Sequence, residues 1–592
     1  MCGIAGFFGE GDRTLLDALA GAMVHRGPDG GGAFHEVPAG LTMRRLAIID
    51  LEGGWQPIGS DDGRLQLVFN GELYNYRELK QTRLPGVAFK TASDTEVVLR
   101  MYEAHGEAAF RELNGMFAFA LWDGRKGRLY LVRDRVGVKP LYYHAGPRRL
   151  TFASELKSLL ADDSVPRRLD HDALAAYLTW QYVPGPATIL AGVYKLPPAS
   201  FMRLEAGQDP VIQAYWSPTE PVPASRSEDF PRVLGDAVRR QMVADVPVGA
   251  FLSGGLDSSL VVALMREHAG PGLKTFTAGF ADARLDESPW AATVAKHLGV
   301  QHEVVRLDDT ALDELPALAW SLDEPVADRA ALPTLLLARA AAREVKVVLT
   351  GEGSDELFGG YPRYRLERWA QRFHALPGRG LLRAIAPALP RKVAKILLSP
   401  ADPARRREQW VANFTPEARA RLLAAPALAA DPPVPADGTL AAQLLLDLRG
   451  WLVDDVLMKV DKTTMAASLE ARVPFLDHDV VDWALGLPDR DKLRGETTKY
   501  VVKRAAERIL PAAVIHRPKQ GFHTPTATWF RAPRGQDLLK DVLLGVTARD
   551  RGLFAPTEVE ALIRRHAQGE DLDQGLWNLM ILELWLRAYR VN

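Results

Sequence analysis

Short apolar runs bounded by turn residues mark the amino-terminal part of the chain as rich in strands. Residues 116–122 (MFAFALW) are continuously apolar, and residues 129–132 (LYLV) follow the turn pair Asp123-Gly124. Two apolar runs joined in this way predict a β-hairpin, and Asn70-Gly71 predicts a second turn. Helical periodicity is seen at residues 14–23 and 95–105. The pattern therefore predicts an α+β domain that contains hairpins.

The pattern changes after residues 217–229 (SPTEPVPASRSED), whose proline and charge content predicts a linker. A surface loop inside one domain is the alternative. Beyond it, strand-like and helix-like stretches alternate, which predicts a doubly wound parallel sheet. The expected strands are 247–252, 274–280, 301–306 and 345–350, and the expected helices are 230–244, a stretch ending at Met265, 289–298 and 334–343. From about residue 361 the composition predicts mainly helices, with an exposed loop at 424–437.

Composition narrows the class of protein. The chain has 592 residues and a net charge of -1, so it is long enough for several domains and carries no broad basic surface for nucleic acid. No apolar run approaches the roughly 18 residues of a membrane span, and the start lacks a signal-peptide pattern. The single cysteine, Cys2, excludes an intrachain disulfide and a cysteine-rich metal site. We expect a multidomain cytoplasmic protein without membrane or nucleic-acid partners.

Cys2 itself is a candidate nucleophile. It follows only the initiator methionine, so removal of that methionine would place a thiol and a free α-amine on one residue. An α-amine titrates near pH ~8 and can act as the base for its own side chain. The alternative is that Cys2 is a small buried apolar residue in a first strand.

Polar residues farther along could hold an amino-acid substrate beside Cys2. Arg45 could bind a carboxylate, Asn70 and Gly71 could stabilise an oxyanion, and Asp94 could bind an ammonium group. Each residue also has a structural interpretation. Asp94 could cap a helix, Asn70-Gly71 could form a hairpin turn, and Arg45 could be a surface charge.

Five motifs give this part of the chain a family resemblance. MCGIAG, HRGPD, RLAIID, FNGELYN and SDTE occur in order, and residues 2–215 resemble the glutaminase domain of class II glutamine amidotransferases. The resemblance implies an N-terminal-nucleophile (αββα) fold in which Cys2, with its own α-amine as base, forms a thioester with glutamine. It implies an oxyanion hole at Asn70 and Gly71 and glutamine binding by Arg45, Leu46, Ala47, Ile48, Ile49, Asn70, Gly71, Glu72 and Asp94.

Two acidic, glycine-containing turns mark a second site. Residues 253–259 (SGGLDSS) lie between an expected strand and helix, where small residues and a helix N-terminus favour phosphate. No lysine follows as in a Walker A motif. Asp257 would repel phosphate without an intervening cation, which argues for Mg²⁺. The turn at 351–356 (GEGSDE) would lie at the same sheet edge, so Asp257 and Asp355 could share that metal. The alternatives are a plain strand–helix turn and a solvated acidic loop.

These turns resemble the ATP-pyrophosphatase (PP-loop) fold of asparagine synthetases. The resemblance extends to VDKTTM, LEARVPFLD, KLR and the HRPKQGF motif that contains Lys519. It implies cleavage of ATP between its α- and β-phosphates, with Glu352 assisting acyl-adenylate chemistry and Lys519 neutralising pyrophosphate. The ATP-binding residues it implies are Phe251, Leu252, Ser253, Gly254, Gly255, Leu256, Asp257, Ser258, Ser259, Ala278, Thr350 and Gly351. The family usually has Leu at position 251.

The two resemblances imply a glutaminase domain at 2–215, a linker at 216–229 and a synthetase domain at 230–592. The expected reaction is ATP-dependent amidation of a carboxylate, most simply aspartate, by glutamine-derived ammonia that passes through an enclosed channel. A peptide, an antibiotic precursor or a surface sugar is the alternative acceptor. Relatives that form β-lactams lack the glutaminase cysteine, which disfavours that activity. A non-catalytic scaffold is a further alternative, and a homodimer is expected by family analogy.

Overall fold

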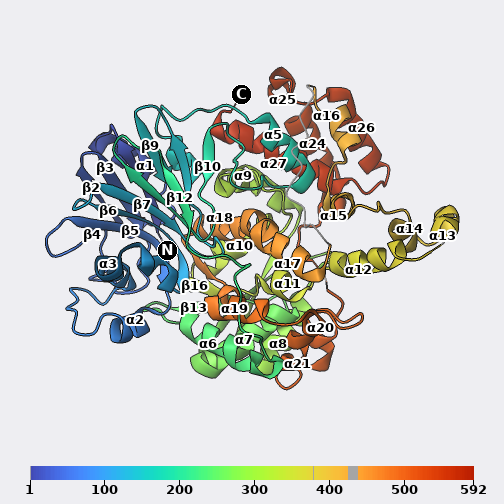
Figure 1. Ribbon diagram of the computed structural model, residues 1–592. Coiled ribbons are helices and arrows are strands. Elements are labelled where there is room, and N and C mark those ends of the chain that lie inside the picture. The colour runs from blue at the N-terminus through green and yellow to red at the C-terminus, as the bar shows by residue number, and fades with distance from the viewer. Residues whose placement is uncertain (1, 378, 425–437, 520, 592) are drawn as a thin grey trace.

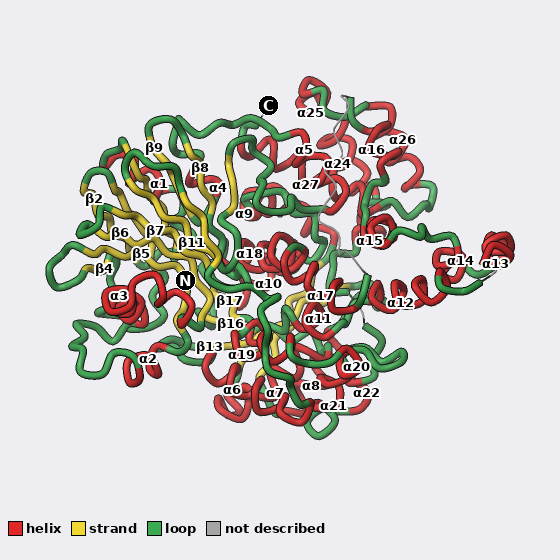
Figure 2. Tube along the Cα trace, in the orientation of Figure 1, coloured by secondary structure: helices red, strands yellow, loops and turns green. Residues whose placement is uncertain are grey.

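The computed structural model describes residues 2–377, 379–424, 438–519 and 521–591. Strands fill the amino-terminal part and helices dominate the carboxy-terminal part (Figures 1 and 2). Most of the expected exposed loop at 424–437 lies outside the described residues. Within the described ranges, no helix combines the length and apolar character needed to cross a membrane.

Two antiparallel sheets pack face to face in the amino-terminal part, and apolar side chains from both fill the space between them. The first sheet has the order β10 (Val193–Lys195), β8 (Tyr142–Ala145), β9 (Arg149–Ala153), β1 (Gly3–Gly9), β3 (Ala39–Arg45) and β2 (Gly30–Glu36). The second has the order β12 (Val211–Ala214), β11 (Ser200–Glu205), β7 (Arg128–Arg133), β6 (Gly115–Asp123), β5 (Leu65–Leu73) and β4 (Ile58–Gly59).

Helices cover the outer faces of this sandwich and complete four layers. Apolar clusters join the first sheet to α1 (Arg13–Gly21), α4 (Leu156–Leu159) and α5 (His171–Trp180), and the second sheet to α2 (Tyr76–Thr82) and α3 (Asp94–His105). Strands β6 and β7 form the predicted hairpin. The αββα arrangement therefore follows from two sheets that each bury both faces.

The predicted turn at Asn70-Gly71 is wrong. Both residues lie inside β5, where they pair with Ala118 and Phe117 of β6. A β-carbon on Gly71 would lie 2.0 Å from the carbonyl oxygen of Met116, and Gly71 has φ +152°. The glycine therefore permits close strand pairing and does not mark a turn.

A parallel sheet forms the centre of the second part, as the alternating pattern predicts. Its order is β15 (Gln301–Leu307), β14 (Lys274–Phe280), β13 (Val248–Phe251), β16 (Val347–Leu349) and β17 (Glu470–Arg472). Strand β17 comes from the part expected to be helical. The helices that follow or flank these strands are α6 (Phe230–Gln241), α7 (Leu256–Ala269), α8 (Ser288–Leu298), α9 (Leu315–Leu322), α10 (Ala331–Ala341) and α11 (Ser354–Phe358).

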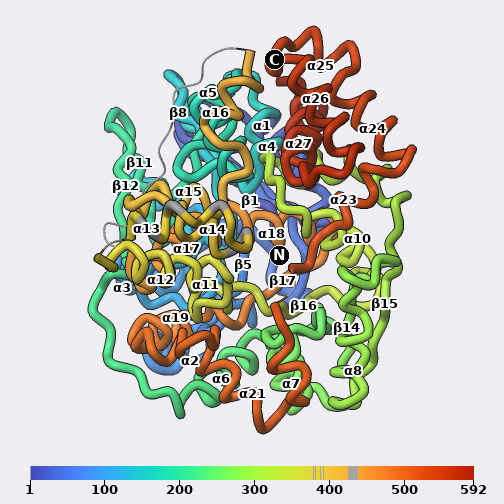
Figure 3. Tube along the Cα trace, turned by 90° about the vertical axis from the view of Figure 1, so that its right-hand side faces the viewer, coloured from blue at the N-terminus to red at the C-terminus, as the bar shows by residue number. Residues whose placement is uncertain are grey.

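The remaining chain is mostly helical, as predicted. Helices α12–α14 project from the body, and α27 packs against α9 and the helices of the first sheet (Figures 1 and 3). The bounds are α12 (Pro362–His374), α13 (Arg379–Ile385), α14 (Arg391–Leu397), α15 (Pro403–Val411), α16 (Pro416–Leu422), α17 (Leu440–Arg449), a π-helix (Leu452–Leu457), α18 (Met458–Met465), α19 (His478–Leu485), α20 (Asp489–Lys492), α21 (Tyr500–Ala506), α22 (Ala512–Ile515), α23 (Thr526–Trp529), α24 (Pro533–Leu544), α25 (Val546–Arg551), α26 (Pro556–Ala567) and α27 (Asp573–Tyr589).

Candidate active sites

Cys2 lies immediately before β1, between the two antiparallel sheets. Its backbone nitrogen donates a hydrogen bond to Asn70 Oδ1 at 3.1 Å. Its carbonyl oxygen accepts a hydrogen bond from Arg26 Nε at 3.1 Å, and Arg26 Nη1 also donates to Asp461 of α18 at 2.8 Å. The candidate nucleophile is therefore tied both to the predicted oxyanion residue and, through Arg26, to the second half of the chain.

The thiol of Cys2 needs a base. Burial raises its pKa, and the nearby carboxylate of Glu72 raises it further. The chain's amino terminus, the Leu46 amide and Arg45 oppose this effect and lower the pKa of Cys2. Because the net shift is upward, attack on a substrate requires the proton to move to a neighbouring group. Removal of Met1 would turn the Cys2 nitrogen into an α-amine on the same residue, which could accept that proton.

The charged residues predicted to bind glutamine come from three elements: Arg45 ends β3, Glu72 lies in β5 and Asp94 begins α3. Arg45 donates to the carbonyl oxygens of Asp50 and Leu51 at 2.6 and 3.0 Å, which fixes its guanidinium. Asp94 accepts from the Leu73 amide at 2.7 Å, and burial raises its pKa. Within the described chain, Glu72 Oε2 is buried without a hydrogen-bond partner. A buried acid with a free acceptor is suited to an ammonium group.

Residues 46–49 connect this site to the second half of the chain. Leu46 and Ile48 belong to the apolar cluster that surrounds the parallel sheet, and Ile49 packs against it. The Ala47 amide donates to Asp29 of the HRGPD motif at 2.9 Å. Residues 46–49 therefore contact the apolar cluster of the second half and Asp29 of the first half. Such contacts with both halves are expected of a binding segment between two domains.

Gly71→Ala should destabilise the second sheet. The new β-carbon would meet the Met116 carbonyl oxygen, which belongs to the paired strand and cannot rotate away. We expect a loss of about 3 kcal/mol or more in the free energy of unfolding, measured by denaturant unfolding, with a matching loss of glutaminase activity. Gly63→Ala is the control, because Gly63 also has a positive φ (+71°) but open space around it. Equal stability of the two variants would contradict the steric argument.

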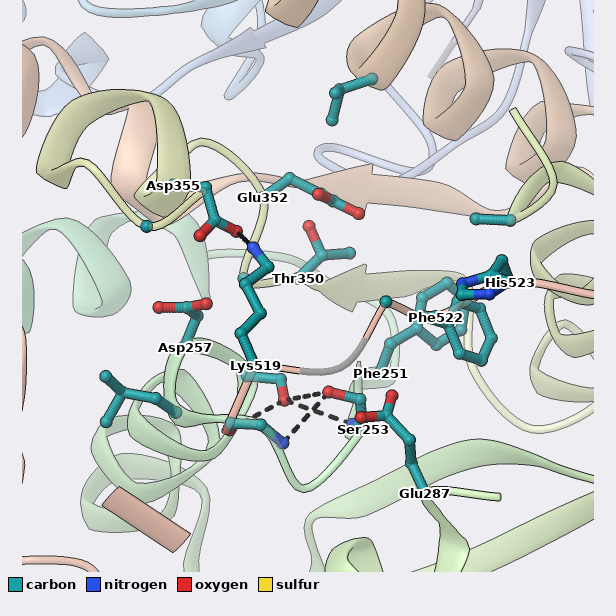
Figure 4. Close-up of a pocket in the computed structure, with 18 of the residues that line it drawn as sticks. Phe251, Ser253, Asp257, Glu287, Thr350, Glu352, Asp355, Lys519, Phe522 and His523 are labelled. Carbon is teal, nitrogen blue, oxygen red and sulfur yellow. Dashed lines mark hydrogen bonds and ion pairs between the residues drawn. The ribbon is translucent and has the colours of Figure 1, made fainter. Parts of the chain in front are cut away.

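The second predicted site forms a cavity of about 460 Å³ at the carboxyl ends of β13 and β16 (Figure 4). The predicted residues that line it are Phe251, Leu252, Ser253, Gly255, Leu256, Asp257, Ser258, Thr350, Gly351, Glu352, Asp355 and Lys519. Three predicted ATP-binding residues, Gly254, Ser259 and Ala278, are not part of the lining. Ala278 is buried in β14, and its neighbours Phe276 and Thr277 face the cavity instead.

The SGGLDSS turn has the geometry of a phosphate cradle. The hydroxyl groups of Ser253 and Ser258 form a hydrogen bond of 3.0 Å, and the Gly255 amide donates to Ser253 Oγ at 3.2 Å. Gly255 is the N-cap residue that immediately precedes α7, and both Gly255 and Leu256 line the cavity, so the helix N-terminus lies at the cavity. Gly254 has φ +68° and packs against α8, where a β-carbon would lie 2.4 Å from the Ala291 nitrogen.

The two predicted metal-binding carboxylates meet at a lysine that the sequence analysis missed. Lys499 Nζ lies 2.6 Å from Asp257 Oδ2 and 2.7 Å from Asp355 Oδ1. Lys519 also pairs with Asp355, so two ammonium groups hold the pKa of that carboxyl below its usual range. Lys519 lies in the HRPKQGF motif, of which Gln520 falls outside the described residues. A single loop lysine such as Lys499 carries no recognisable sequence signal.

These donors are compatible with Mg²⁺. Among the described residues, no three Asp, Glu, His or Cys side chains converge as a complete metal site. Asp257 and Asp355 nevertheless supply two hard oxygen ligands beside the cradle, and protein-bound Mg²⁺ commonly uses one or two carboxylates together with substrate phosphates. The donor chemistry therefore fits the ion.

The sequence analysis also missed two further charged residues in the cavity lining, Lys459 and Asp328. Lys459 Nζ lies 2.9 Å from Asp328 Oδ2 and 4.0 Å from Glu352 Oε1. Gln181 lines the same cavity although it follows α5 of the amino-terminal domain, and it donates to Asp455 at 2.8 Å. The cavity thus has a positive charge on Lys459 and a negative charge on Asp328 close to Glu352. Such a pair of opposite charges is suited to a zwitterionic substrate.

Glu356 should make stability depend on pH. Burial and the charge of Asp355 raise the pKa of Glu356 to about 7, and Tyr361 donates to its Oε1 at 2.6 Å. The unfolded chain loses this proton near pH ~4.5, so between pH ~4.5 and ~7 the folded state binds more protons and stability falls as pH rises. Glu356→Gln should therefore stabilise the protein by about 1–3 kcal/mol more at high than at low pH. Denaturant unfolding near pH 5 and pH 8.5 tests this; a pH-independent difference would contradict it.

Comparisons with known proteins cover almost the whole chain. A family model described as "Asparagine synthase" matches residues 229–587, and one described as "Glutamine amidotransferase domain" matches residues 1–216. The Bacillus subtilis (strain 168) protein "Asparagine synthetase (glutamine-hydrolyzing) 1" is 35% identical over 99% of this chain and 96% of its own length. A Mycobacterium bovis protein, whose name also contains asparagine synthetase, is 38% identical over 99% and 97%. "Amidase chry2" of Gibberella zeae is 29% identical over 88% and 86%.

The matches and the sheets together confirm the predicted fold class. An N-terminal-nucleophile αββα domain precedes a parallel-sheet domain with a helical carboxy-terminal part. The two family models stop and start on either side of the segment predicted as a linker.

Proposed function

This chain belongs to the glutamine-hydrolysing asparagine synthetase family, and from this premise we propose that it converts L-aspartate, L-glutamine, ATP and water into L-asparagine, L-glutamate, AMP and pyrophosphate. The observation that carries the choice of aspartate is the charge arrangement beside the phosphate cradle. Lys459 and Asp328 lie next to Glu352 in the same cavity, where they could bind the carboxylate and ammonium groups of a small amino acid.

Glutamine hydrolysis takes place at Cys2 once its α-amine is free. The thiol attacks the amide carbon and its proton passes to the α-amine, while the Asn70 side-chain amide and the Gly71 N–H stabilise the oxyanion. Ammonia leaves with that proton and a thioester remains. Water then attacks the thioester, releasing glutamate and restoring the thiol. Arg45, Glu72 and Asp94 hold the charged end of glutamine.

The second half activates the acceptor. A carboxylate is a poor electrophile, so its oxygen attacks the α-phosphorus of ATP, pyrophosphate leaves, and an acyl-AMP forms. Lys499, Lys519 and the N-terminus of α7 neutralise the charge on the departing pyrophosphate. Mg²⁺, held by Asp257 and Asp355, would supply further charge neutralisation on the phosphates. Ammonia attacks the acyl carbon, AMP leaves, and Glu352, which lines the cavity, accepts the proton released.

Ammonia is proposed to pass between the sites inside the protein. Near neutral pH free ammonia is mostly ammonium and is not nucleophilic, so an enclosed path preserves its reactivity. The proposed division is a glutaminase domain at 2–215, a linker at 216–229 and a synthetase domain at 230–592, acting in the cytoplasm and as a homodimer. Isotopic ammonium added during glutamine-dependent turnover should not enter the product; free mixing would contradict the channel.

The acceptor is tested by pyrophosphate release. The enzyme would be supplied with ATP, Mg²⁺ and ammonium chloride together with L-aspartate, D-aspartate, L-glutamate or an aspartyl peptide. We expect release with L-aspartate to exceed release with each of the others by at least about tenfold, since the site must pair two charged groups and also direct the reacting carboxylate at ATP, and a change of configuration, chain length or bulk misplaces one of these groups. Faster release with the aspartyl peptide would identify a different acceptor within the same chemistry.

A further inference from the structure

Arg472 of β17 contacts elements of both active sites. Strand β17 is the edge strand of the parallel sheet, and in two perpendicular views it lies close to the amino terminus of the chain (Figures 2 and 3). The Arg472 side chain is completely buried. A buried arginine at a domain contact needs acceptors for all its donors, and the partners of this one come from both domains.

The guanidinium is held in one orientation by the synthetase domain. Nη1 donates to the carbonyl oxygens of Gln241 and Val243, both at 2.7 Å, and Nε donates to Glu470 Oε1 at 2.6 Å. Within the described chain, Nη2 has no hydrogen-bond partner, and it lies 3.6 Å from Oε1 of Glu72 in the glutaminase domain. The free edge of the guanidinium is therefore directed at a residue predicted to bind glutamine.

The backbone of Arg472 reaches the nucleotide cavity. Its carbonyl oxygen accepts a hydrogen bond from the Thr350 amide at 2.9 Å, and Arg472 pairs with Leu349 in the β16–β17 register. Thr350 and Gly351 line the cavity. A single residue thus connects the end of β16 at the nucleotide site to Glu72 at the glutamine site.

We propose that Arg472 is a positioning residue for glutamine hydrolysis: it is supplied by the synthetase domain and holds Glu72, in its charged form, toward the ammonium group of glutamine. The inference rests on the proposed function and deepens it. The glutamine site is then incomplete without β17. The synthetase domain therefore contributes a residue to glutamine hydrolysis in addition to its packing contacts with the glutaminase domain.

The electrostatic surroundings of Glu72 explain why it needs this partner. Burial raises the pKa of Glu72 well above its usual range, and the carboxylates of Glu470 and Asp94 raise it further. Arg472 and the chain's amino terminus lower it. Among the described residues, the Cys2 thiol and the Tyr74 hydroxyl are further ionisable neighbours of Glu72. Without Arg472, Glu72 would remain protonated to higher pH and would lose its attraction for an ammonium group.

The test compares Arg472→Met and Arg472→Lys in the full-length enzyme. For Arg472→Met we expect kcat/KM for glutamine to fall by about 10- to 100-fold, mainly through KM, because a charge-assisted interaction is lost. The acid limb of its pH profile should move to higher pH. Ammonia-dependent synthesis should stay within about twofold of wild type, because the Thr350 contact uses only the backbone. Arg472→Lys keeps the charge and should recover part of the loss.

Arg135→Ala is the matched control, because Arg135 also joins the domains through Asp482 at 3.1 Å but does not contact the glutamine site. A wild-type KM and acid limb in Arg472→Met would overturn the inference. So would an equal loss of both activities in Arg472→Met and Arg135→Ala, which would indicate a purely structural role. Failure of the proposed function would look different, because the wild-type enzyme itself would then hydrolyse no glutamine.

Discussion

Cys2→Ala should abolish glutamine-dependent synthesis, with a loss of about 10⁴-fold or more, since no other group can form the thioester. The same variant should retain ammonia-dependent synthesis, because the described residues that line the nucleotide cavity include neither Cys2 nor any residue of β1. The side chain is small and buried, so its replacement by alanine leaves the sheets in place. Steady-state rates of pyrophosphate release with glutamine and with ammonium chloride measure the two activities separately.

Cys2→Ser is the informative companion, because it keeps the α-amine and a weaker nucleophile in the same position. It should bind glutamine but hydrolyse it very slowly. Since the chain has one cysteine, a thiol-directed reagent should reproduce the effect of Cys2→Ala on the wild-type enzyme and have none on the variant. Loss of ammonia-dependent synthesis in Cys2→Ala would contradict the separation of the two sites.

The sequence predicted those parts of the fold that local pattern determines. Strands β13, β14, β15 and β16 of the parallel sheet could be located because each apolar run is bounded by turn residues and followed by a helix, and the predicted bounds of β14 agree with the observed ones to the residue. The prediction of a turn at Asn70-Gly71 was wrong because local turn propensity competes with strand pairing. Here the pairing of β5 with β6 determines the conformation of both residues. Strand β17 was missed because three residues between helices carry too short a pattern to recognise.

In the candidate sites, too, the sequence identified residues that belong to local motifs and missed residues whose partners are distant in the chain. Cys2, Asp257 and Asp355 could be identified because each belongs to a motif whose residue types require a chemical explanation. Lys499 and Arg472 could not, because their roles depend on partners 242 and 400 positions away, Asp257 and Glu72. An isolated lysine or arginine becomes informative only when the fold shows which carboxylate it meets. A residue outside every quoted motif, such as Lys499 or Arg472, is therefore found only from the fold, whereas Arg26, which also joins the two halves, stands in the HRGPD motif.

Lys499→Met should show the reverse of the Cys2→Ala pattern. Lys499 is the cation between Asp257 and Asp355, next to the phosphate cradle. Its removal would take away the ammonium group that contacts both carboxylates, and among the described residues Asp257 would then keep no ion pair, while Asp355 would keep its pair with Lys519. We expect synthesis with glutamine and with ammonia to fall by about 10²–10³-fold, as for loss of a preorganised electrostatic group. Glutamine hydrolysis should remain within about twofold of wild type.

Lys503→Met is the matched comparison for this prediction. Lys503 lines the same cavity from α21, and among the described side chains it forms no ion pair with Asp257 or Asp355. Its loss should reduce synthesis by only about tenfold or less, because no carboxylate is left unbalanced. Equal defects in the two variants would show that the cavity needs positive charge in general. A defect specific to Lys499→Met shows instead that the position between the two carboxylates is what pyrophosphate release requires.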